Sequence, residues 1–474
     1  MVATRAFSSS VASRRQILRD LALNNFDPYP QAATPPTLVS WANLTGNNVT
    51  INGSTYGIHT MQYQPTAANV TWIGANPIST YDGASNSYTD QHVNYGGANR
   101  TGQHYVLRFV TDAPGIAIGY VTTLGNTLNV MVDGQIANRA ADYPMWNTGS
   151  TLAGFVVLTF ATLPTTYELD SFAISTAGSG YNLGDTVTFT GGTFTTPVQV
   201  YITGSGAQQC LIANRGVYSV QATGAGALTQ SSTSGSGTGL TLTPTWRQTT
   251  AIRKRTVELM IPGAMIIKGI AVGAAYHVAP APVRGPRALV FGDSLVEGSF
   301  VDFTRGQWFH SGLRRLGFDD IWGSGVGGTG YVNSGTSPRV NFLGRINDIT
   351  DFAPDLVVVP GSTNDGSSSA ATVQANVTSF WQSVRAALPK ATLVAMAPWT
   401  LTSATTDQAH ADAVKNGVTA ANANVSYIDT YGLGWCHTTG DWMTSPRTVH
   451  WGQQGHDAIG ALFAEALRPI LAAA

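Results

Sequence analysis

The chain has 474 residues, a formal net charge of −1 and only 11% charged residues, well below the roughly 25% of an ordinary globular domain. This length predicts two or three domains. The balanced charge, without clusters of Lys and Arg, argues against a nucleic-acid-binding protein. No apolar run reaches the roughly 18 residues of a membrane-spanning helix, so we expect none.

The composition also bears on location and on cysteine chemistry. The 52 glycines, with frequent Ser, Thr and Asn, are typical of turn-rich β structure with a neutral polar surface, as in secreted and virion-surface proteins. The first residues lack the apolar core of a signal peptide. We therefore expect an extracellular or virion-surface protein that bypasses the standard secretory route, with the cytoplasm as the other location. Cys210 and Cys436 are far apart and predict neither a disulfide nor a metal site.

Residues 1–37 form an N-terminal segment. An amphipathic stretch runs from Arg14 to Leu23, and a Pro-rich sequence follows it. We interpret the segment as a terminal helix and a linker. The alternative is an attachment or oligomerisation segment.

Residues 38–165 and 247–284 predict one all-β domain, a sandwich of the jelly-roll kind. Short runs rich in β-branched and aromatic residues, bounded by Gly, Asn or Asp, indicate its strands. These runs cover residues 105–110, 128–132, 155–160, 255–261 and 266–272.

Residues 166–246 predict a small β domain inserted into that sandwich. Between Ser171 and Trp246 only Asp185 and Arg215 are charged. Gly, Ser and Thr dominate, but apolar and polar residues alternate too regularly for a flexible linker.

Residues 285–474 predict an α/β domain, and a Pro-rich stretch marks its start. Continuous apolar runs are typical of buried parallel strands, and helical patterns alternate with them. The expected strands are 288–293, 319–325, 355–361, 391–398 and 425–430, and the expected helices are 373–388, 407–422 and 453–471. We expect a three-layer, flavodoxin-like doubly wound sheet with its site beyond the carboxyl ends of the strands.

Three of the strand-tip loops carry groups suited to acyl transfer. Ser294, in FGDSL, directly follows a buried strand, where its hydroxyl would lie near the positive end of the next helix; its alternative role is to cap that helix. Gly328 lies in GSGVGGTGY, whose backbone N–H groups can approach a ligand oxygen. That loop also fits the dinucleotide pattern G-x-G-x-x-G, but no helix is expected after it. Asn364, in PGSTND, can aim its amide at the same point or can form an Asx turn.

Two histidines lie near the last expected helix. His450, in VHWGQQGH, lies in the loop, and His456 lies at the helix start. A general base belongs on the loop, so His450 is the predicted base and His456 a packing or capping residue.

The order Ser, Gly, Asn, His over four strand-tip loops resembles the SGNH hydrolase superfamily, also called GDSL esterases. The similarity covers residues 287–474. It implies that Ser294 is the nucleophile, Gly328 and Asn364 are oxyanion donors, and His450 is the base. It implies no metal or organic cofactor.

The chain departs from the family's final block, D-x-x-H. Arg447 stands three residues before His450, where the family has an Asp, and Trp451 follows the histidine. Either a backbone carbonyl holds the imidazole, which we prefer, or Asp441 does so through a longer loop. An inactive relic is the third possibility.

The resemblance implies a serine esterase. A β-sandwich before an SGNH domain resembles carbohydrate acetylesterases, and the Gly/Thr-rich insert resembles modules of phage tail proteins. Together they suggest O-deacetylation of a polysaccharide, on a virion and in a homotrimer if tail-associated. Tryptophans near the site, namely Trp399, Trp435, Trp442 and Trp451, either stack on sugars or pack. The alternatives are a glycan- or partner-binding protein with a degenerate SGNH domain, and a lipase or general carboxylesterase.

Overall fold

The computed structural model describes residues 38–58, 60–77, 90–92, 104–122, 128–136, 152–160, 166–204, 209–249, 254–262, 265–299, 301, 305–361, 363–399, 404–435 and 450–474. Two compact units divide the chain. One is residues 161–254, and the other combines residues 1–160 with residues 255–474. The N-terminal segment 1–37 and Cys436 lie outside the described residues, and Cys210 has a free thiol.

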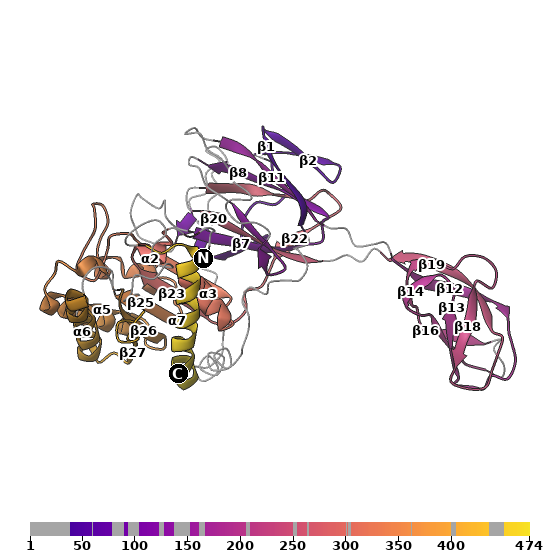
Figure 1. Ribbon diagram of the computed structural model, residues 1–474. Coiled ribbons are helices and arrows are strands. Elements are labelled where there is room, and N and C mark those ends of the chain that lie inside the picture. The colour runs from indigo at the N-terminus through magenta and orange to yellow at the C-terminus, as the bar shows by residue number, and fades with distance from the viewer. Residues whose placement is uncertain are drawn as a thin grey trace. The chain divides into compact units, whose positions relative to one another are not determined.

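The larger unit contains two antiparallel sheets that share one core (Figure 1). Leu107 and Val257 from one sheet pack with Ile118 and Leu158 from the other. The first sheet has the order β1 (Leu38–Thr45), β11 (Leu152–Phe160), β8 (Gly115–Thr122) and β21 (Met265–Ala271). The second has the order β10 (Gln135–Ile136), β9 (Asn129–Val132), β20 (Arg255–Pro262), β7 (His104–Thr111) and β22 (Val278–Pro280), and β4 (Thr71–Ile73) also pairs with β7.

Two small hairpins accompany the sandwich. They are β2 (Asn48–Ile51) with β3 (Ser54–Gly57), and β5 (Ala75–Pro77) with β6 (Asp90–His92).

The smaller unit is one eight-stranded antiparallel sheet with its own core. Its strands are β12 (Thr166–Thr176), β13 (Thr186–Thr190), β14 (Thr193–Thr196), β15 (Gln199–Ile202), β16 (Cys210–Asn214), β17 (Val217–Val220), β18 (Leu228–Thr233) and β19 (Thr241–Thr249). The first and last of these pair from Thr166 opposite Thr249 onward. Strand β19 thus runs three residues past the end that the sequence predicts for the insert.

The C-terminal part of the larger unit is a parallel sheet in the order β24 (Asp320–Gly325), β23 (Arg287–Gly292), β25 (Leu356–Gly361), β26 (Thr392–Pro398) and β27 (Val425–Ile428). In chain order this is 2-1-3-4-5, the flavodoxin-like arrangement. The three central strands, β23, β25 and β26, are largely continuous apolar runs because both faces of the sheet are covered.

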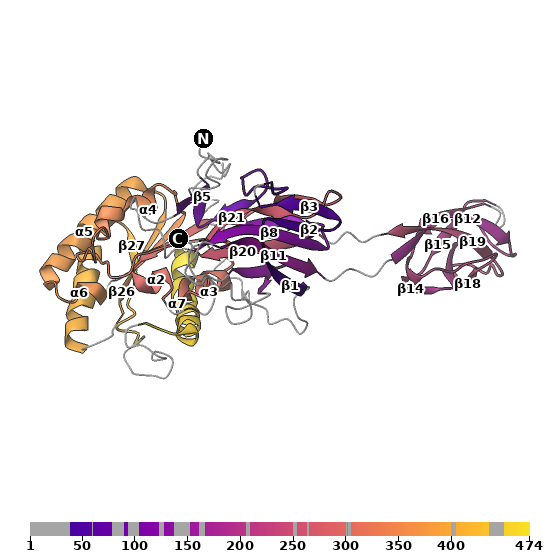
Figure 2. The same ribbon diagram turned by 90° about the horizontal axis from the view of Figure 1, so that it is seen from above.

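Helices cover both faces of the parallel sheet (Figures 1 and 2). One face packs on α5 (Ala370–Ala387) and α6 (Ala404–Ala421), and the other on α3 (Trp308–Arg315) and α7 (Gln453–Ala473). Helix α5 begins three residues before the expected start because Ser369 caps it, accepting a hydrogen bond from the Thr372 N–H. Short elements complete the domain: α2 (Ser294–Glu297), η1 (Leu343–Arg345), α4 (Asn347–Thr350) and η2 (Thr363–Asp365).

The predicted fold class is confirmed: an antiparallel β-rich region precedes an α/β domain with a parallel sheet. No helix among the described residues combines the length and the apolar character needed to cross a membrane.

Candidate active site

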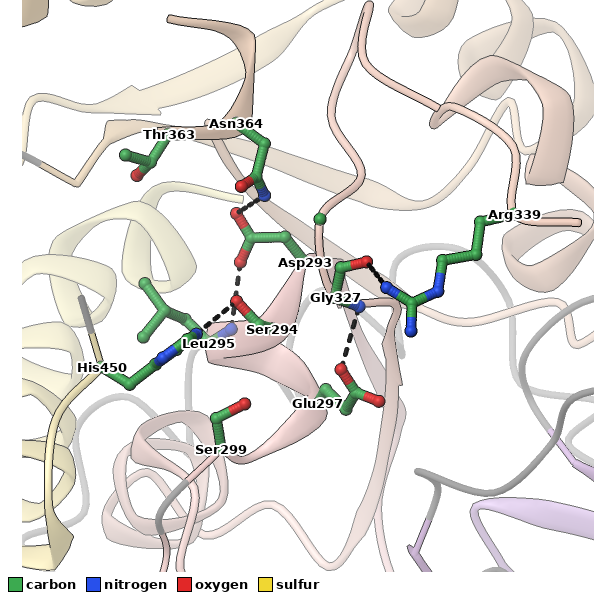
Figure 3. A pocket seen from close by; sticks show the side chains of 11 residues that line it. Asp293, Ser294, Leu295, Glu297, Ser299, Gly327, Arg339, Thr363, Asn364 and His450 are labelled. Atoms are coloured by element: carbon green, nitrogen blue, oxygen red, sulfur yellow. Dashed lines mark hydrogen bonds between the residues drawn. The ribbon is translucent and has the colours of Figure 1, made fainter. Parts of the chain in front are cut away.

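The four predicted site residues meet at one edge of the parallel sheet. Ser294, Gly328 and Asn364 follow β23, β24 and β25, which are adjacent and parallel, so their carboxyl ends share that edge. His450 lies just before α7. All four residues line a single pocket of about 420 Å³. Figure 3 shows Ser294, Asn364 and His450 in this pocket. The pocket lies where the winding of the sheet reverses, the usual ligand position in this topology.

Ser294 is the first residue of α2, a helix of one turn. The cap of this helix is Asp293, whose carboxylate accepts a hydrogen bond from the Leu295 N–H at 3.0 Å. Gly298, with φ of 92°, ends the turn. The capping alternative for Ser294 is therefore wrong. A single turn has only a small macrodipole, so the helix field expected at the hydroxyl is weak, and the turn itself sets the position of the hydroxyl.

His450 is the partner of this hydroxyl. Its Nε2 lies 2.8 Å from the Ser294 Oγ (Figure 3). The ring is half-buried, and this burial lowers its pKa below the ordinary value. A neutral imidazole with Nε2 as acceptor can take the serine proton. Arg447 and Asp441 lie outside the described residues, so the group that orients His450 stays a prediction.

Backbone and amide donors line the same pocket as the Ser294 hydroxyl. Within the described part of the chain, the N–H groups of Ser294 and Gly328 have no hydrogen-bond acceptor. Gly328 has φ of 77°, a conformation that favours glycine. The Asn364 Nδ2 donates to the Thr329 carbonyl at 3.0 Å and lies 3.4 Å from an Asp293 carboxylate oxygen. These groups could bind a negative charge that develops beside Ser294.

Asp365 holds the glycine loop and the Asn364 loop together, a role that the sequence analysis missed. Its buried carboxylate accepts three backbone N–H groups, from Tyr331, Val332 and Asn333, at 2.8 to 3.0 Å. The Asn333 side chain in turn donates to the Asn364 carbonyl at 2.9 Å. The available signal was its place directly after Asn364 in PGSTND, a segment in which the sequence analysis assigned a role only to Asn364.

Arg345 joins two of the strand ends that carry the site. Its buried guanidinium donates to the carbonyls of Gly292, at the end of β23, and Ser324, in β24. It lies 3.8 Å from the centre of the Phe291 ring and pairs with Asp348 at 3.4 Å. No local sequence pattern indicates this role, because the two carbonyls that Arg345 binds lie more than 20 residues away along the chain.

The tryptophans near the site serve packing. Trp399, Trp435 and Trp451 are at most 6% exposed. The Trp399 ring packs edge-on against Trp451 at 4.9 Å and stacks on Trp435 at 6.3 Å. The rings of these three tryptophans are therefore not accessible to a sugar ring. Trp442 lies outside the described residues.

His456 is fully buried, with both ring nitrogens engaged. Its Nδ1 accepts the Trp308 N–H at 3.3 Å, and its Nε2 lies 3.2 Å from the Ser299 carbonyl. Burial lowers its pKa to about 4. A neutral histidine with both nitrogens committed to the backbone is a structural residue.

Among the residues with described positions, no group of three His, Cys, Asp or Glu side chains could hold a metal ion. The resemblance to SGNH hydrolases implies no cofactor, and this expectation stays a prediction.

The fold and the strand-tip segments define an α/β domain of the SGNH class. Residues 290–458 match the family described as GDSL-like lipase/acylhydrolase. The C-terminal part of the chain is a domain of this family, and the predicted recognition is confirmed.

Solved structures that are similar over most of the chain share little sequence identity with it. No curated protein matches the sequence. The solved salicylyl-acyltransferase SsfX3 from a tetracycline biosynthetic pathway is 15% identical, with a TM-score of 0.48, over 86% of this chain and 97% of that one. A family two carbohydrate esterase from Clostridium thermocellum in complex with cellohexaose is 13% identical (TM-score 0.41), over 78% of this chain and 93% of that one. The acetyl xylan esterase Est2A from the rumen bacterium Butyrivibrio proteoclasticus is 10% identical (TM-score 0.43), over 91% of this chain and 98% of that one.

Proposed function

We propose that the GDSL-like domain is a serine esterase with Ser294 as nucleophile and His450 as general base. The observation that carries the proposal is the 2.8 Å contact between the His450 Nε2 and the Ser294 Oγ, in a pocket that Gly328 and Asn364 also line. A nucleophile within hydrogen-bond reach of its base is the signature of covalent catalysis.

The reaction proceeds by two acyl transfers. His450 Nε2 takes the Ser294 proton as Oγ forms a bond to the ester carbonyl carbon. The resulting oxyanion accepts hydrogen bonds from the N–H groups of Ser294 and Gly328 and from the Asn364 amide. The carbon–oxygen bond to the alcohol then breaks, and the alcohol leaves with the proton from His450. Water, deprotonated by His450, attacks the acyl-enzyme, and the acid leaves as Ser294 regains its proton.

The pocket favours a small acyl group. Among its described lining residues only Leu295 has a large apolar side chain, and the others are polar or glycine. A long alkyl chain needs extended apolar contact, about 0.8 kcal/mol for each buried CH₂. This lining supports acetyl esters over the long-chain esters of a lipase.

The natural substrate in this proposal is an O-acetylated polysaccharide. Support comes from the layout of a β-sandwich followed by an SGNH domain, which resembles carbohydrate acetylesterases. A role on a phage tail or virion, with a homotrimeric assembly, rests on the Gly/Thr-rich insert alone. Both are arguments from resemblance.

The deciding experiment compares wild type with Ser294→Ala on p-nitrophenyl acetate. We expect a loss of roughly 10⁶-fold in kcat, as for other serine nucleophiles. The matched control is Ser379→Ala, on the exposed face of α5, which should keep wild-type activity. Equal rates for wild type and Ser294→Ala would instead favour a binding protein with a degenerate domain.

A chain-length series separates the esterase from a lipase. Acetate should be preferred over octanoate, and the reverse order would support the lipase. Release of acetate from an acetylated polysaccharide such as acetylated xylan, lost in Ser294→Ala, tests the natural substrate.

A further inference from the structure

Gly327, next to the proposed oxyanion glycine, is held on both sides by charged side chains. Its N–H donates to the Glu297 Oε2 at 2.9 Å, and its carbonyl accepts a hydrogen bond from the Arg339 Nη1 (Figure 3). Glu297 and Arg339 line the same pocket as Ser294. Neither has a part in the esterase mechanism given above.

The contact with Arg339 acts on the proposed donor itself. The Gly327 carbonyl and the Gly328 N–H belong to one planar peptide unit, in which they point in opposite directions. A bond that fixes the carbonyl therefore also fixes the direction of the Gly328 N–H. Because the guanidinium is charged, its hydrogen bond is stronger than a neutral one and polarises the amide, which makes the N–H a better donor.

The contact with Glu297 acts on the preceding peptide unit. Glu297 lies on the same single helical turn as Ser294, three residues away, so one turn carries both the nucleophile and one holder of the loop. Burial raises the pKa of Glu297, which the Gly327 N–H and the positive charges of Arg339 and Arg345 oppose. The contact thus ties the loop directly to the element that places the serine.

The loop has glycines where these contacts need them. A Cβ on Gly327 would lie 2.7 Å from the Glu297 Oε2, so a side chain there would displace the carboxylate. Gly328 takes a left-handed conformation, with φ of 77°.

We propose that Arg339 and Glu297 are positioning residues that clamp Gly327 and thereby aim the Gly328 N–H at the oxyanion. This rests on the proposed esterase function. A clamp of this kind acts on the transition state, because the oxyanion does not exist in the bound ester. Its loss should therefore lower kcat and leave KM nearly unchanged.

The test uses the full chain and p-nitrophenyl acetate, a neutral ester. Arg339→Ala should lower kcat by about 10- to 100-fold, less than the ~10²–10³ for deletion of a donor, because the N–H is misdirected and not removed. Guanidinium chloride at low millimolar concentration should restore part of the rate in Arg339→Ala. Arg339→Lys should have an intermediate kcat. Arg284→Ala, which removes another exposed arginine, is the matched control and should behave as wild type.

Glu297 provides a second test that does not depend on Arg339→Ala folding. The amide oxygen of Glu297→Gln can still accept the Gly327 N–H, whereas Glu297→Ala cannot. We expect kcat to be higher in Glu297→Gln than in Glu297→Ala. Equal values in these two variants would overturn the role of Glu297.

The outcomes separate this proposal from the esterase itself. If Ser294→Ala is inactive but Arg339→Ala and Arg339→Lys keep the wild-type kcat, the esterase stands and the clamp is refuted. A rise in KM for an anionic ester, with kcat on the neutral ester unchanged, would also refute it and make Arg339 a substrate-binding residue. If Ser294→Ala is as active as wild type, both proposals fail.

Discussion

The His450 Nε2 lies 2.8 Å from the Ser294 Oγ, and both side chains are half-buried. Burial disfavours the charged imidazolium, so the pKa of His450 is lowered. The base is therefore neutral over a wider acidic range than a free histidine. The position of the ring and its protonation state at neutral pH both suit proton abstraction.

The acid limb of the pH–rate profile should report this pKa. We expect kcat/KM for p-nitrophenyl acetate to fall on acidification with a midpoint below about 6.5, the usual histidine value, because activity requires neutral His450 in the free enzyme. The measurement is a series of initial rates across the acidic range in buffers of constant ionic strength. A midpoint at or above the usual value would contradict the desolvated environment described here.

A side chain at Gly328 should reduce both the stability and the activity of the protein, and the two effects can be measured separately. An alanine at φ of 77° costs roughly 1–2 kcal/mol and shifts the proposed oxyanion N–H. We expect Gly328→Ala to lose about 10²-fold in kcat, the effect of losing one donor. Denaturant unfolding and steady-state kinetics measure the two effects.

The matched control is Gly53→Ala in the β2–β3 hairpin. Gly53 has φ of 79°, and a Cβ added to it would have no atom within 4 Å. The two variants should lose similar stability, but Gly53→Ala should keep the wild-type kcat. A similar loss of kcat in both would mean that backbone strain, and not the oxyanion donor, explains the result.

The sequence predicts those site residues whose positions depend on a single neighbouring strand or helix. Ser294, Gly328 and Asn364 each follow a predicted strand of the parallel sheet, and parallel strands bring their ends to one edge whatever the intervening helices are. The His450 loop followed from the helical pattern after it. These positions could be predicted because each depends on a short segment of chain.

The supporting residues could not be found in the same way. Glu297 and Arg339 meet at Gly327 across gaps of 30 and 12 residues, and Arg339 lies in a loop without periodicity. The tryptophans lie in or near the loops at the site edge, where they could have bound a sugar. The sequence pattern does not say whether the side chain of a loop residue is exposed or buried in the core. Long-range contacts decide such cases, and one sequence does not contain them.

Glu258 lies buried among three arginines where the sandwich meets the α/β domain. Its carboxylate pairs with Arg108 at 3.0 Å, Arg305 at 3.4 Å and Arg314 at 3.6 Å. Burial alone would raise the pKa of Glu258, but the three positive charges together lower it below the ordinary value. Arg108 also pairs with Asp319. This network crosses from β7 and β20 to α3 and its flanking loops.

Removal of this one carboxylate should be costly. Glu258→Ala removes the carboxylate that three buried or half-buried arginines share, and breaking a buried pair in this way costs about 3–5 kcal/mol. Because the folded-state pKa is lowered, the stabilisation is present above the unfolded pKa of about 4.3 and is lost as the pH falls through the folded-state value. Denaturant unfolding of wild type and variant at several pH values should therefore converge at acidic pH.

Glu465→Ala controls for the loss of any glutamate. Glu465 pairs with Arg468 at 3.3 Å, but its side chain is 74% exposed. Its removal should cost at most about 1 kcal/mol, as for other surface pairs. A Glu258→Ala variant no less stable than Glu465→Ala would show that the buried network does not stabilise the fold.

The smaller unit should be removable without loss of the esterase site. Within the sandwich its two attachment points are neighbours, because the Arg255 guanidinium lies over the Phe160 ring at 5.0 Å. Within the insert, the pairing of Thr166 with Thr249 likewise brings the two ends together. A short linker can therefore join the two attachment points of the larger unit when the insert is removed. The insert has its own buried core.

We expect a chain in which a linker of about four Gly/Ser residues replaces residues 161–254 to fold and to hydrolyse p-nitrophenyl acetate at the wild-type rate. None of the described residues that line the pocket comes from the insert. Circular dichroism and thermal unfolding would establish folding before the rates are compared. Folded but inactive protein would contradict the prediction and show that the insert contributes to the site. Loss of activity on acetylated polysaccharide alone would mean that the insert holds the polymer while the α/β domain performs the chemistry.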